Sequence, residues 1–178
     1  MALKPWKVLE SSYLRSNVRV DKCETSTGKI IEPLIFEYRS WVTIIGLTKQ
    51  NEVLMIKQYR HGMQDILWEL PGGGVEKGEK PLFAAERELL EETGYASNRV
   101  IEIGKVSPNP ASHTNLMYAY LAFDVEKVSE QNLDETEEIE VFPTPLDEVI
   151  LMAKRGELIQ SLHVSTLFFA LHHLNRIA

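Results

Sequence analysis

The stretch that most constrains the fold runs from Pro71 to Gly94, where a glycine-rich loop leads directly into a strongly patterned segment. Pro81 suits the first turn of a helix, and Gly94 suits the position that ends one. Apolar residues recur between them at helical spacing, at Leu82, Ala85 and Leu89. The pattern predicts a helix over residues 81–93, preceded by a loop whose backbone can approach a ligand closely.

Three glutamates crowd one face of this predicted helix. At about 100° per residue, Glu92 lies about 40° around the helix from Glu88, and Glu91 lies about 60° to the other side. One interpretation is a solvated face, because glutamate is a good helix former. The other is a site for a hard divalent cation. The glycine-rich loop favours the second interpretation, because its exposed carbonyls can supply a further oxygen ligand.

Composition and charge limit the classes of protein to which this chain can belong. With 178 residues, 44% of them hydrophobic and 25% charged, it predicts one globular domain with a small appended arm. The net charge of −7 and the lack of a basic block argue against nucleic acid or an anionic membrane as the main partner. Cys23 is the only cysteine, which excludes an internal disulfide and indicates a reducing compartment. The sequence has neither a signal-like apolar segment nor a membrane-length apolar run, so we expect a cytoplasmic protein.

Strand patterns with interspersed helix patterns fill the rest of the chain. Residues 6–22 and 30–42 alternate loosely on either side of a turn signal and predict an N-terminal hairpin. Further strands are predicted as two runs within 43–60 and over 66–71, 99–111, 116–125 and 139–145, helices over 146–157 and 161–176, and an acidic loop over 126–138. This mixture indicates an α+β fold or a mixed α/β/α sandwich.

Two groups of residues receive a structural interpretation. The last predicted helix carries three histidines without a carboxylate partner at ligand spacing, so we expect surface or capping roles for His163, His172 and His173. Aromatic residues near the N-terminus are expected in core or interface positions rather than as platforms for a base: Trp6, Tyr13, Tyr38 and Trp41.

Nine residues fill the fixed positions of a known motif. They are Gly73, Glu79, Arg87, Glu88, Leu89, Glu91, Glu92, Gly94 and Tyr95. Their pattern, Gly-x5-Glu-x7-Arg-Glu-hydrophobic-x-Glu-Glu-x-Gly-hydrophobic, is similar to the Nudix box. Tyr95 is a soft departure, because an aliphatic residue is usual there. The chain therefore resembles the Nudix hydrolases, which implies an α/β fold: the Nudix α/β/α sandwich with a mixed sheet and an N-terminal β arm.

The resemblance implies a metal site on the predicted helix. Glu88 and Glu92 correspond to direct ligands of the catalytic Mg²⁺, for which Mn²⁺ can substitute. Glu91 corresponds to a further ligand or to a residue acting through a bound water. The carbonyl of Gly72, just before the box, is often a ligand too. Arg87 corresponds to a structural and electrostatic partner of the loop and helix, with a direct catalytic role as the alternative.

Residues outside the box resemble the branch of ADP-ribose pyrophosphatases and nucleoside diphosphate sugar hydrolases. Arg60 matches the arginine that contacts the substrate diphosphate in that branch, with a surface salt bridge as the alternative. Arg39 is a weaker candidate for the same pocket. Pro110 and a two-stranded arm, residues 1–40, are also typical of the branch, whose members use the arm to form a two-fold dimer. We therefore expect a homodimer, with the Nudix hydrolase domain over residues 41–178.

The general base in this branch comes from an acidic loop outside the box. The segment LDETEEIEV resembles that loop, with Glu135 as the best positional match and Glu137 next. A glutamate near a metal-bound water is suited to accept its proton. The alternatives are a solvated charge run and a base supplied by Glu91.

The resemblance implies metal-dependent hydrolysis of the pyrophosphate bond of ADP-ribose and related nucleoside diphosphate sugars, giving a nucleoside monophosphate and a sugar phosphate. GDP-mannose, a dinucleoside polyphosphate or a capped RNA end are alternative substrates, although the acidic charge disfavours RNA. A non-catalytic nucleotide sensor is a third hypothesis. Such domains usually lose a box carboxylate, whereas this chain keeps all three.

Overall fold

The computed structural model describes residues 4–177, and the chain divides into two compact units. The first unit comprises Met1–Arg39 and Ser107–Leu116. The second comprises Ser40–Val106 and Met117–Ala178, and it contains the whole glycine loop and the acidic helix.

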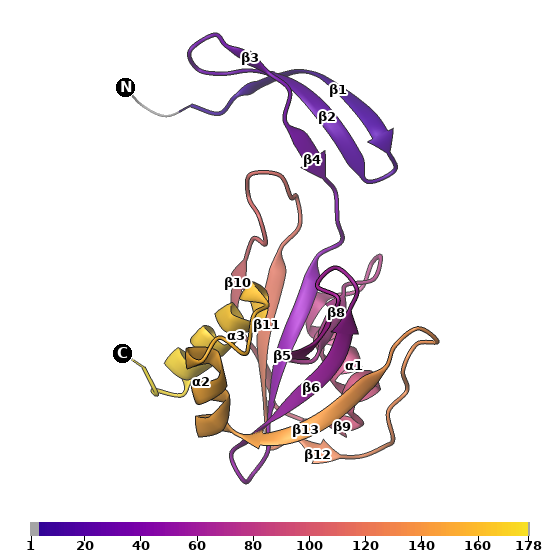
Figure 1. The fold of residues 1–178 in the computed structure, drawn as a ribbon, viewed down its shortest axis with the longest axis vertical. Helices are drawn as coiled ribbons and strands as arrows, with labels where there is room; N and C mark the ends of the chain where they lie inside the picture. The colour runs from indigo at the N-terminus through magenta and orange to yellow at the C-terminus, as the bar shows by residue number, and fades with distance from the viewer. Residues whose placement is uncertain (1–3, 178) are drawn as a thin grey trace. The chain divides into compact units, whose positions relative to one another are not determined.

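The first unit is built on a small antiparallel sheet (Figure 1). Its strands are β1 (Lys7–Arg15), β2 (Val18–Glu24), β3 (Ile30–Ile31) and β4 (Leu34–Phe36). β2 pairs with each of the other three. The hairpin turns at residues 16–17, so the expectation of one strand over residues 6–22 is wrong. The loose alternation continues through the turn, which therefore leaves no break in the hydrophobic pattern.

The segment 107–116 belongs to the first unit because it bonds to the end of β4. The Phe36 N–H donates to the Ser112 carbonyl at 2.7 Å, and the Thr114 N–H donates to the Phe36 carbonyl at 3.1 Å. The rings of Phe36, Tyr38 and His113 pack together here. Tyr38 is nonetheless exposed, as are Trp6 and Tyr13, so a core position is wrong for these three aromatic residues.

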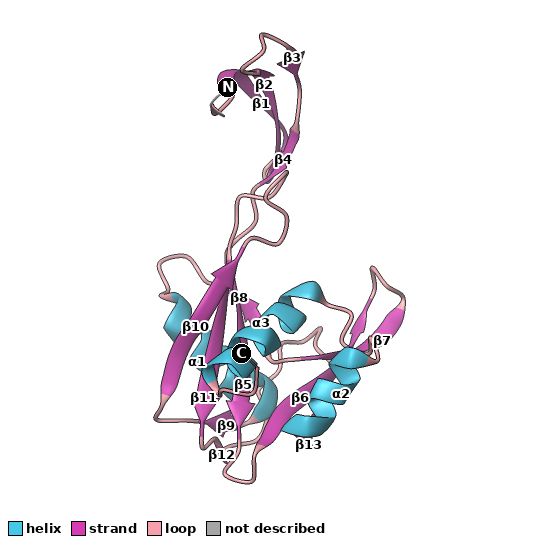
Figure 2. Ribbon diagram, turned by 90° about the vertical axis from the view of Figure 1, so that its left-hand side faces the viewer, coloured by secondary structure: helices cyan, strands magenta, loops and turns pink. Residues whose placement is uncertain are grey.

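The second unit is a mixed seven-stranded sheet with helices on both faces (Figure 2). The sheet contains β5 (Trp41–Leu47), β6 (Glu52–Arg60), β7 (Asp65–Glu69), β8 (Gly72–Gly74), β10 (Val100–Val106), β11 (Met117–Phe123) and β13 (Ile139–Pro145). Its main path runs β10-β11-β5-β6-β13, with β7 on β6 and β8 on β5. β11 and β5 are parallel, and the other described pairs of this sheet are antiparallel. β9 (Tyr95–Ala96) and β12 (Glu126–Lys127) form a separate pair.

Alternation along the central strands determines which helix covers which face. Val42 and Ile44 of β5 pack with Ala85 and Leu89 of α1 (Pro81–Thr93). The intervening side chains, such as Ile45, join a second core under α2 (Leu146–Lys154) and α3 (Ser161–His173). The expected α/β/α sandwich with a mixed sheet is therefore confirmed.

The helix predictions are confirmed most closely where local signals are strongest. α1 begins at Pro81, and Gly94 caps it in the left-handed conformation with φ of 75°. α2 ends before Gly156, whose φ of 77° cannot continue a helix. Among residues 4–177, no helix has the length and apolar character needed to span a bilayer.

Candidate active site

Gly72 lies where β8 passes β5 at close range. A Cβ at this position would lie 2.2 Å from the Val42 carbonyl oxygen, so the close approach requires glycine. The Gly72 N–H points away from β5 and donates to Glu92 Oε2 at 2.8 Å. The N–H and C=O of one residue in an extended strand point to the same side, so the Gly72 carbonyl also faces the side of Glu92.

Gly73 makes room for Glu88 in the same way. A Cβ on Gly73 would lie 2.3 Å from Glu88 Oε1. The loop backbone and the two carboxylates of α1 are therefore in direct contact. Gly72 and Gly73 are needed for this contact, which explains why a run of glycines precedes the acidic helix.

Arg87 ties the loop to the helix. Its Nε and Nη2 donate to Glu79 at 3.1 and 3.2 Å, and Nη2 also donates to the Gly74 carbonyl at 3.1 Å. Nη1 donates to Glu88 Oε1 and Glu91 Oε2, each at 2.9 Å. Hydrogen bonding to Glu79 is the largest cause that raises the Arg87 pKa, and the same contact lowers the pKa of Glu79. These contacts give Arg87 the geometry of a positioning residue.

Burial makes the carboxylates of Glu88 and Glu92 unusual. Glu92 is 3% exposed, and burial raises its pKa well above the usual value. Burial also raises the pKa of Glu88, although Arg87 opposes this shift. The charge of Glu137 raises both pKa values further, which places this loop glutamate within electrostatic range of the pair. The acidic face is therefore not a solvated one, because its central members are desolvated and repel one another.

The residues present fit a hard divalent cation. Within residues 4–177, no three His, Cys, Asp or Glu side chains converge as metal ligands do. The expected direct ligands, however, are two carboxylates and a carbonyl: those of Glu88, Glu92 and Gly72. All are hard oxygen donors. A dication beside them would offset both the desolvation of the carboxylates and the repulsion between their charges. Glu91 bonds to Arg87 instead, so its role as a further ligand stays a prediction.

Arg60 is held in place by the buried carboxylate of Glu69, a partner that was not predicted from the sequence. Its Nε and Nη2 donate to Glu69 Oε1 and Oε2 at 2.9 and 2.6 Å, and Glu69 is 2% exposed. Hydrogen bonding to Glu69 raises the Arg60 pKa most, and the charges of Glu92 and Glu137 raise it further. In the part of the chain that the structure describes, Nη1 has no hydrogen-bond acceptor. The guanidinium is thus fixed close to the carboxylates with donors free for an anion.

The acidic loop that follows β12 is anchored at its base. Gln131 Nε2 donates to the Glu92 carbonyl at 2.6 Å and to the Ile139 carbonyl at 3.2 Å. This amide joins the C-terminal end of α1 to the start of β13. Glu137 closes a turn by accepting the Asp134 N–H at 3.1 Å. Glu135 is exposed in the same turn, whereas the charge of Glu137 acts on the helix carboxylates.

His163 corrects an expectation. It is 2% exposed rather than at the surface, and its Nδ1 accepts the Leu70 N–H at 2.9 Å. Burial lowers its pKa to about 4, so the ring is neutral near pH 7. His163 therefore fixes the backbone two residues before Gly72. The surface prediction is confirmed for His172 and His173, which are exposed.

The structure does not bring every candidate to one place. Glu88, Glu91, Glu92, Arg87 and Gly72 share the loop and helix, and Arg60 and Glu137 lie within electrostatic range. Arg39 is the last residue of the first segment of the other unit, and its role stays a prediction. The contacts that Glu69, Gln131 and His163 make were not predicted from the sequence. The Glu-x-Pro sequence was a signal for Glu69, but nothing local marks the other two, because their partners are distant in sequence.

An α/β/α sandwich that holds the carboxylates of Glu88 and Glu92 against a glycine-rich loop suits a hydrolase that acts on phosphoanhydrides with divalent metal ions. Comparison with known proteins agrees with this class. Residues 37–162 match the NUDIX domain. The chain belongs to the NUDIX family.

Relatives and a solved structure extend the match beyond the box. The chain is 30% identical over 139 residues to the ADP-ribose pyrophosphatase of Bacillus subtilis (strain 168), covering 78% of this chain and 75% of that protein. It is 30% identical over 145 residues to the methanol dehydrogenase activator of Bacillus methanolicus, covering 81% and 78%. The crystal structure of an ADP compounds hydrolase matches with a TM-score of 0.85 at 24% identity, covering 99% of this chain and 100% of that one.

Proposed function

We propose that this chain hydrolyses the pyrophosphate bond of ADP-ribose and related nucleoside diphosphate sugars, with Mg²⁺ as the cofactor and Mn²⁺ as a substitute. The observation that carries the proposal is the contact of Gly72 and Gly73 with two mutually repelling carboxylates, those of the buried Glu92 and the partly buried Glu88. The similarity to an ADP-ribose pyrophosphatase over most of both chains supports the substrate class.

Different residues of this chain bind the cation, orient the diphosphate and accept the proton. Glu88, Glu92 and the Gly72 carbonyl would hold the cation, which when bound supplies a Lewis acid and neutralises phosphate charge. Arg60 binds and orients the diphosphate through its free donors, while Glu69 fixes its direction. A glutamate of the acidic loop accepts a proton from the attacking water. The new P–O bond forms to that water, and the bridging P–O bond breaks to give AMP and ribose 5-phosphate from ADP-ribose.

Glu137 is the loop glutamate that we assign to this site, because its charge acts on Glu88 and Glu92. Glu135 remains the alternative base from its position in the sequence. Separate Glu137→Gln and Glu135→Gln variants distinguish them: kcat falls about 10²-fold or more for the base and changes little for the other residue. If kcat stays within about twofold in both, the loop does not supply the base, and Glu91 becomes the candidate.

A panel of substrates tests the proposed activity. Nucleoside diphosphate sugars, GDP-mannose, a dinucleoside polyphosphate and a capped RNA are assayed for phosphate after phosphatase treatment, with and without Mg²⁺. We expect the strongest metal-dependent response with ADP-ribose. A flat panel in the presence of metal would falsify the enzyme proposal and favour a nucleotide sensor.

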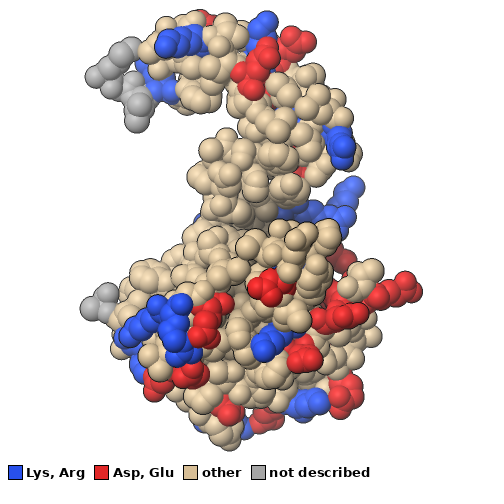
Figure 3. Space-filling view, in the orientation of Figure 1, with Lys and Arg blue, Asp and Glu red and all other residues tan. Residues whose placement is uncertain are grey.

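The surface charge of the protein bears on whether capped RNA is its substrate. On the face of the second unit drawn in Figure 3, acidic and basic side chains of the described residues are interspersed and form no continuous basic band. The net charge of −7 points the same way. We therefore propose small nucleotides rather than RNA as substrates, and we place the enzyme in the cytoplasm, which suits its single cysteine.

We also propose that the chain forms a homodimer through the N-terminal arm, residues 1–40. The supporting observation is that all nine residues of β1 are exposed, including large apolar side chains such as Tyr13 and Leu14. A strand with this composition favours a partner.

A further inference from the structure

A cavity of about 550 Å³ opens in the second unit beside Arg60. Its walls come from the start of β5, from the β6–β7 hairpin and from the segment before α3. The apolar side chains that line it are Trp41, Met63, Leu67 and Ile159. The Arg60–Glu69 pair supplies the charged wall, and Gln160 supplies an amide. This volume lies within the range of small-molecule sites.

The lining suits a flat aromatic group better than a sugar. A ribose presents hydroxyls that each need a polar partner, whereas four of the lining side chains are apolar. Trp41 is partly buried, because it packs on the core that contains Met117 and Leu162. Its ring is therefore held in place and can stack on a base without losing much freedom.

Arg60 connects this cavity to the site of cleavage. It lines the cavity, and the charges of Glu92 and Glu137 both act on it. A diphosphate held by Arg60 would therefore lie close to both the carboxylates and the cavity. The group attached to that diphosphate then has the apolar recess beside Arg60 within reach.

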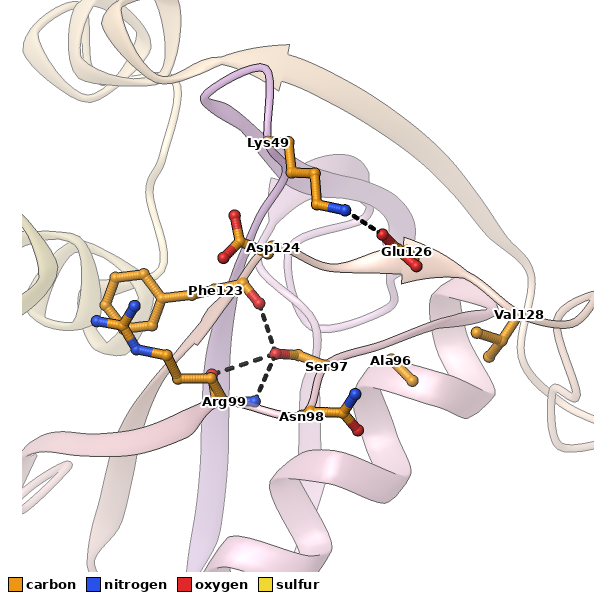
Figure 4. Close-up of a pocket in the computed structure, with 9 residues that line it drawn as sticks. All are labelled: Lys49, Ala96, Ser97, Asn98, Arg99, Phe123, Asp124, Glu126 and Val128. Carbon is orange, nitrogen blue, oxygen red and sulfur yellow. Dashed lines mark hydrogen bonds and ion pairs between the residues drawn. The ribbon is translucent and has the colours of Figure 1, made fainter.

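A second cavity, of about 300 Å³, does not compete for this role (Figure 4). Several of its polar groups already have partners within the chain: Lys49 pairs with Glu126, and the Ser97 hydroxyl bonds to the Phe123 carbonyl. Arg99 lies over the Phe123 ring, with 3.9 Å between its Cζ and the ring centroid. None of the candidate site residues lines this cavity.

We propose that the cavity beside Arg60 is the nucleobase subsite, with Trp41 as its stacking platform and Met63 and Ile159 as its outer walls. The inference rests on the proposed function, because it assigns the base end of the same substrate. It also assigns a direction: the nucleoside points from Arg60 toward α3, and the sugar phosphate leaves on the other side of the diphosphate.

Binding of the two product molecules tests the assignment without relying on turnover. AMP carries the base, and ribose 5-phosphate does not. We expect AMP to quench the fluorescence of Trp41 and ribose 5-phosphate to leave it unchanged. The signal should disappear in Trp41→Phe and persist in Trp68→Phe, since Trp68 does not line this cavity. Quenching that persists in Trp41→Phe would place the base elsewhere.

Truncation of the outer walls provides the second measurement. Met63 and Ile159 are 60% and 48% exposed, so the Met63→Ala/Ile159→Ala double variant should fold normally. We expect its AMP affinity by calorimetry to fall about tenfold or more, with ribose 5-phosphate binding unchanged. Ile66→Ala is the matched control, because Ile66 is a 61% exposed neighbour of Leu67 whose side chain points to the other face of β7. AMP binding should survive in it.

Three outcomes overturn the subsite: unchanged AMP binding in the double variant, an equal loss of AMP and ribose 5-phosphate binding, or no AMP binding to the wild-type chain up to about 1 mM. The hydrolase proposal is judged separately, by whether AMP and ribose 5-phosphate form from ADP-ribose. Its failure and the failure of the subsite are therefore distinguishable.

Discussion

Gly73 shows how one missing side chain shapes the site. Replacing it with alanine places a methyl group 2.3 Å from Glu88 Oε1, so the carboxylate must move. We expect Gly73→Ala to lower kcat about 10- to 100-fold, as for other changes that misplace metal ligands, and to weaken Mn²⁺ binding measured by calorimetry. Gly74→Ala is the matched control, because a Cβ there meets no atom within 4 Å. Equal activity in the two variants would contradict this role of Gly73.

His163 makes stability depend on pH. Burial lowers its folded-state pKa to about 4, whereas the unfolded chain binds the proton near pH 6.5. Its contribution to stability is therefore present above about pH 6.5 and is lost as the pH falls toward 4, by about 3 kcal/mol. The charge of Glu69 opposes this shift of the pKa, and that of Arg60 supports it.

Urea unfolding of the wild type and His163→Asn between pH 7 and pH 4 checks this prediction. Asparagine keeps a hydrogen-bond acceptor near Leu70 but does not titrate. The stability difference between the two proteins should shrink as the pH falls. A difference that stays constant over this range would show that His163 does not titrate on unfolding.

At the scale of the elements, the sequence predicts what local chemistry determines. Pro81, Gly94 and the helical period mark α1 without reference to distant residues, and the box positions identify its carboxylates. The turn within residues 6–22 was missed because alternation continues across it. The contacts of Gln131 and His163 could not be predicted, because each depends on strands and helices brought together only by folding.

The side-chain amide of Gln131 holds the acidic loop in position. Gln131 bridges the carbonyls of Glu92 and Ile139, so Gln131→Ala should free the segment that carries Glu137. We expect kcat to fall about tenfold, with Mn²⁺ affinity nearly unchanged because α1 and the glycine loop stay in place. Asn132→Ala is the control, since Asn132 bonds to α1 through its backbone N–H alone. A loss of metal affinity as large as the loss of kcat would argue against a loop-positioning role.

At the scale of the whole molecule, the exposed arm predicts assembly. We expect a dimer by light scattering at about 10 µM, and a shift toward monomer in Leu14→Glu, which places a charge on the exposed β1. Phe83→Glu is the control, because Phe83 is similarly exposed but lies on α1. A wild-type monomer, or a dimer unaffected by Leu14→Glu, is the contrary result.

The whole account depends on a divalent cation held by the loop and helix carboxylates. Glu92→Gln tests it most directly, because glutamine keeps an oxygen for the Gly72 N–H but removes the charge and one of the two carboxylate oxygens. With ADP-ribose and Mg²⁺, we predict product formation by the wild type, its loss on addition of EDTA, and a decrease of about 10²-fold or more in the folded Glu92→Gln variant. Undiminished turnover of ADP-ribose by the variant, or by the wild type in EDTA, would contradict the account.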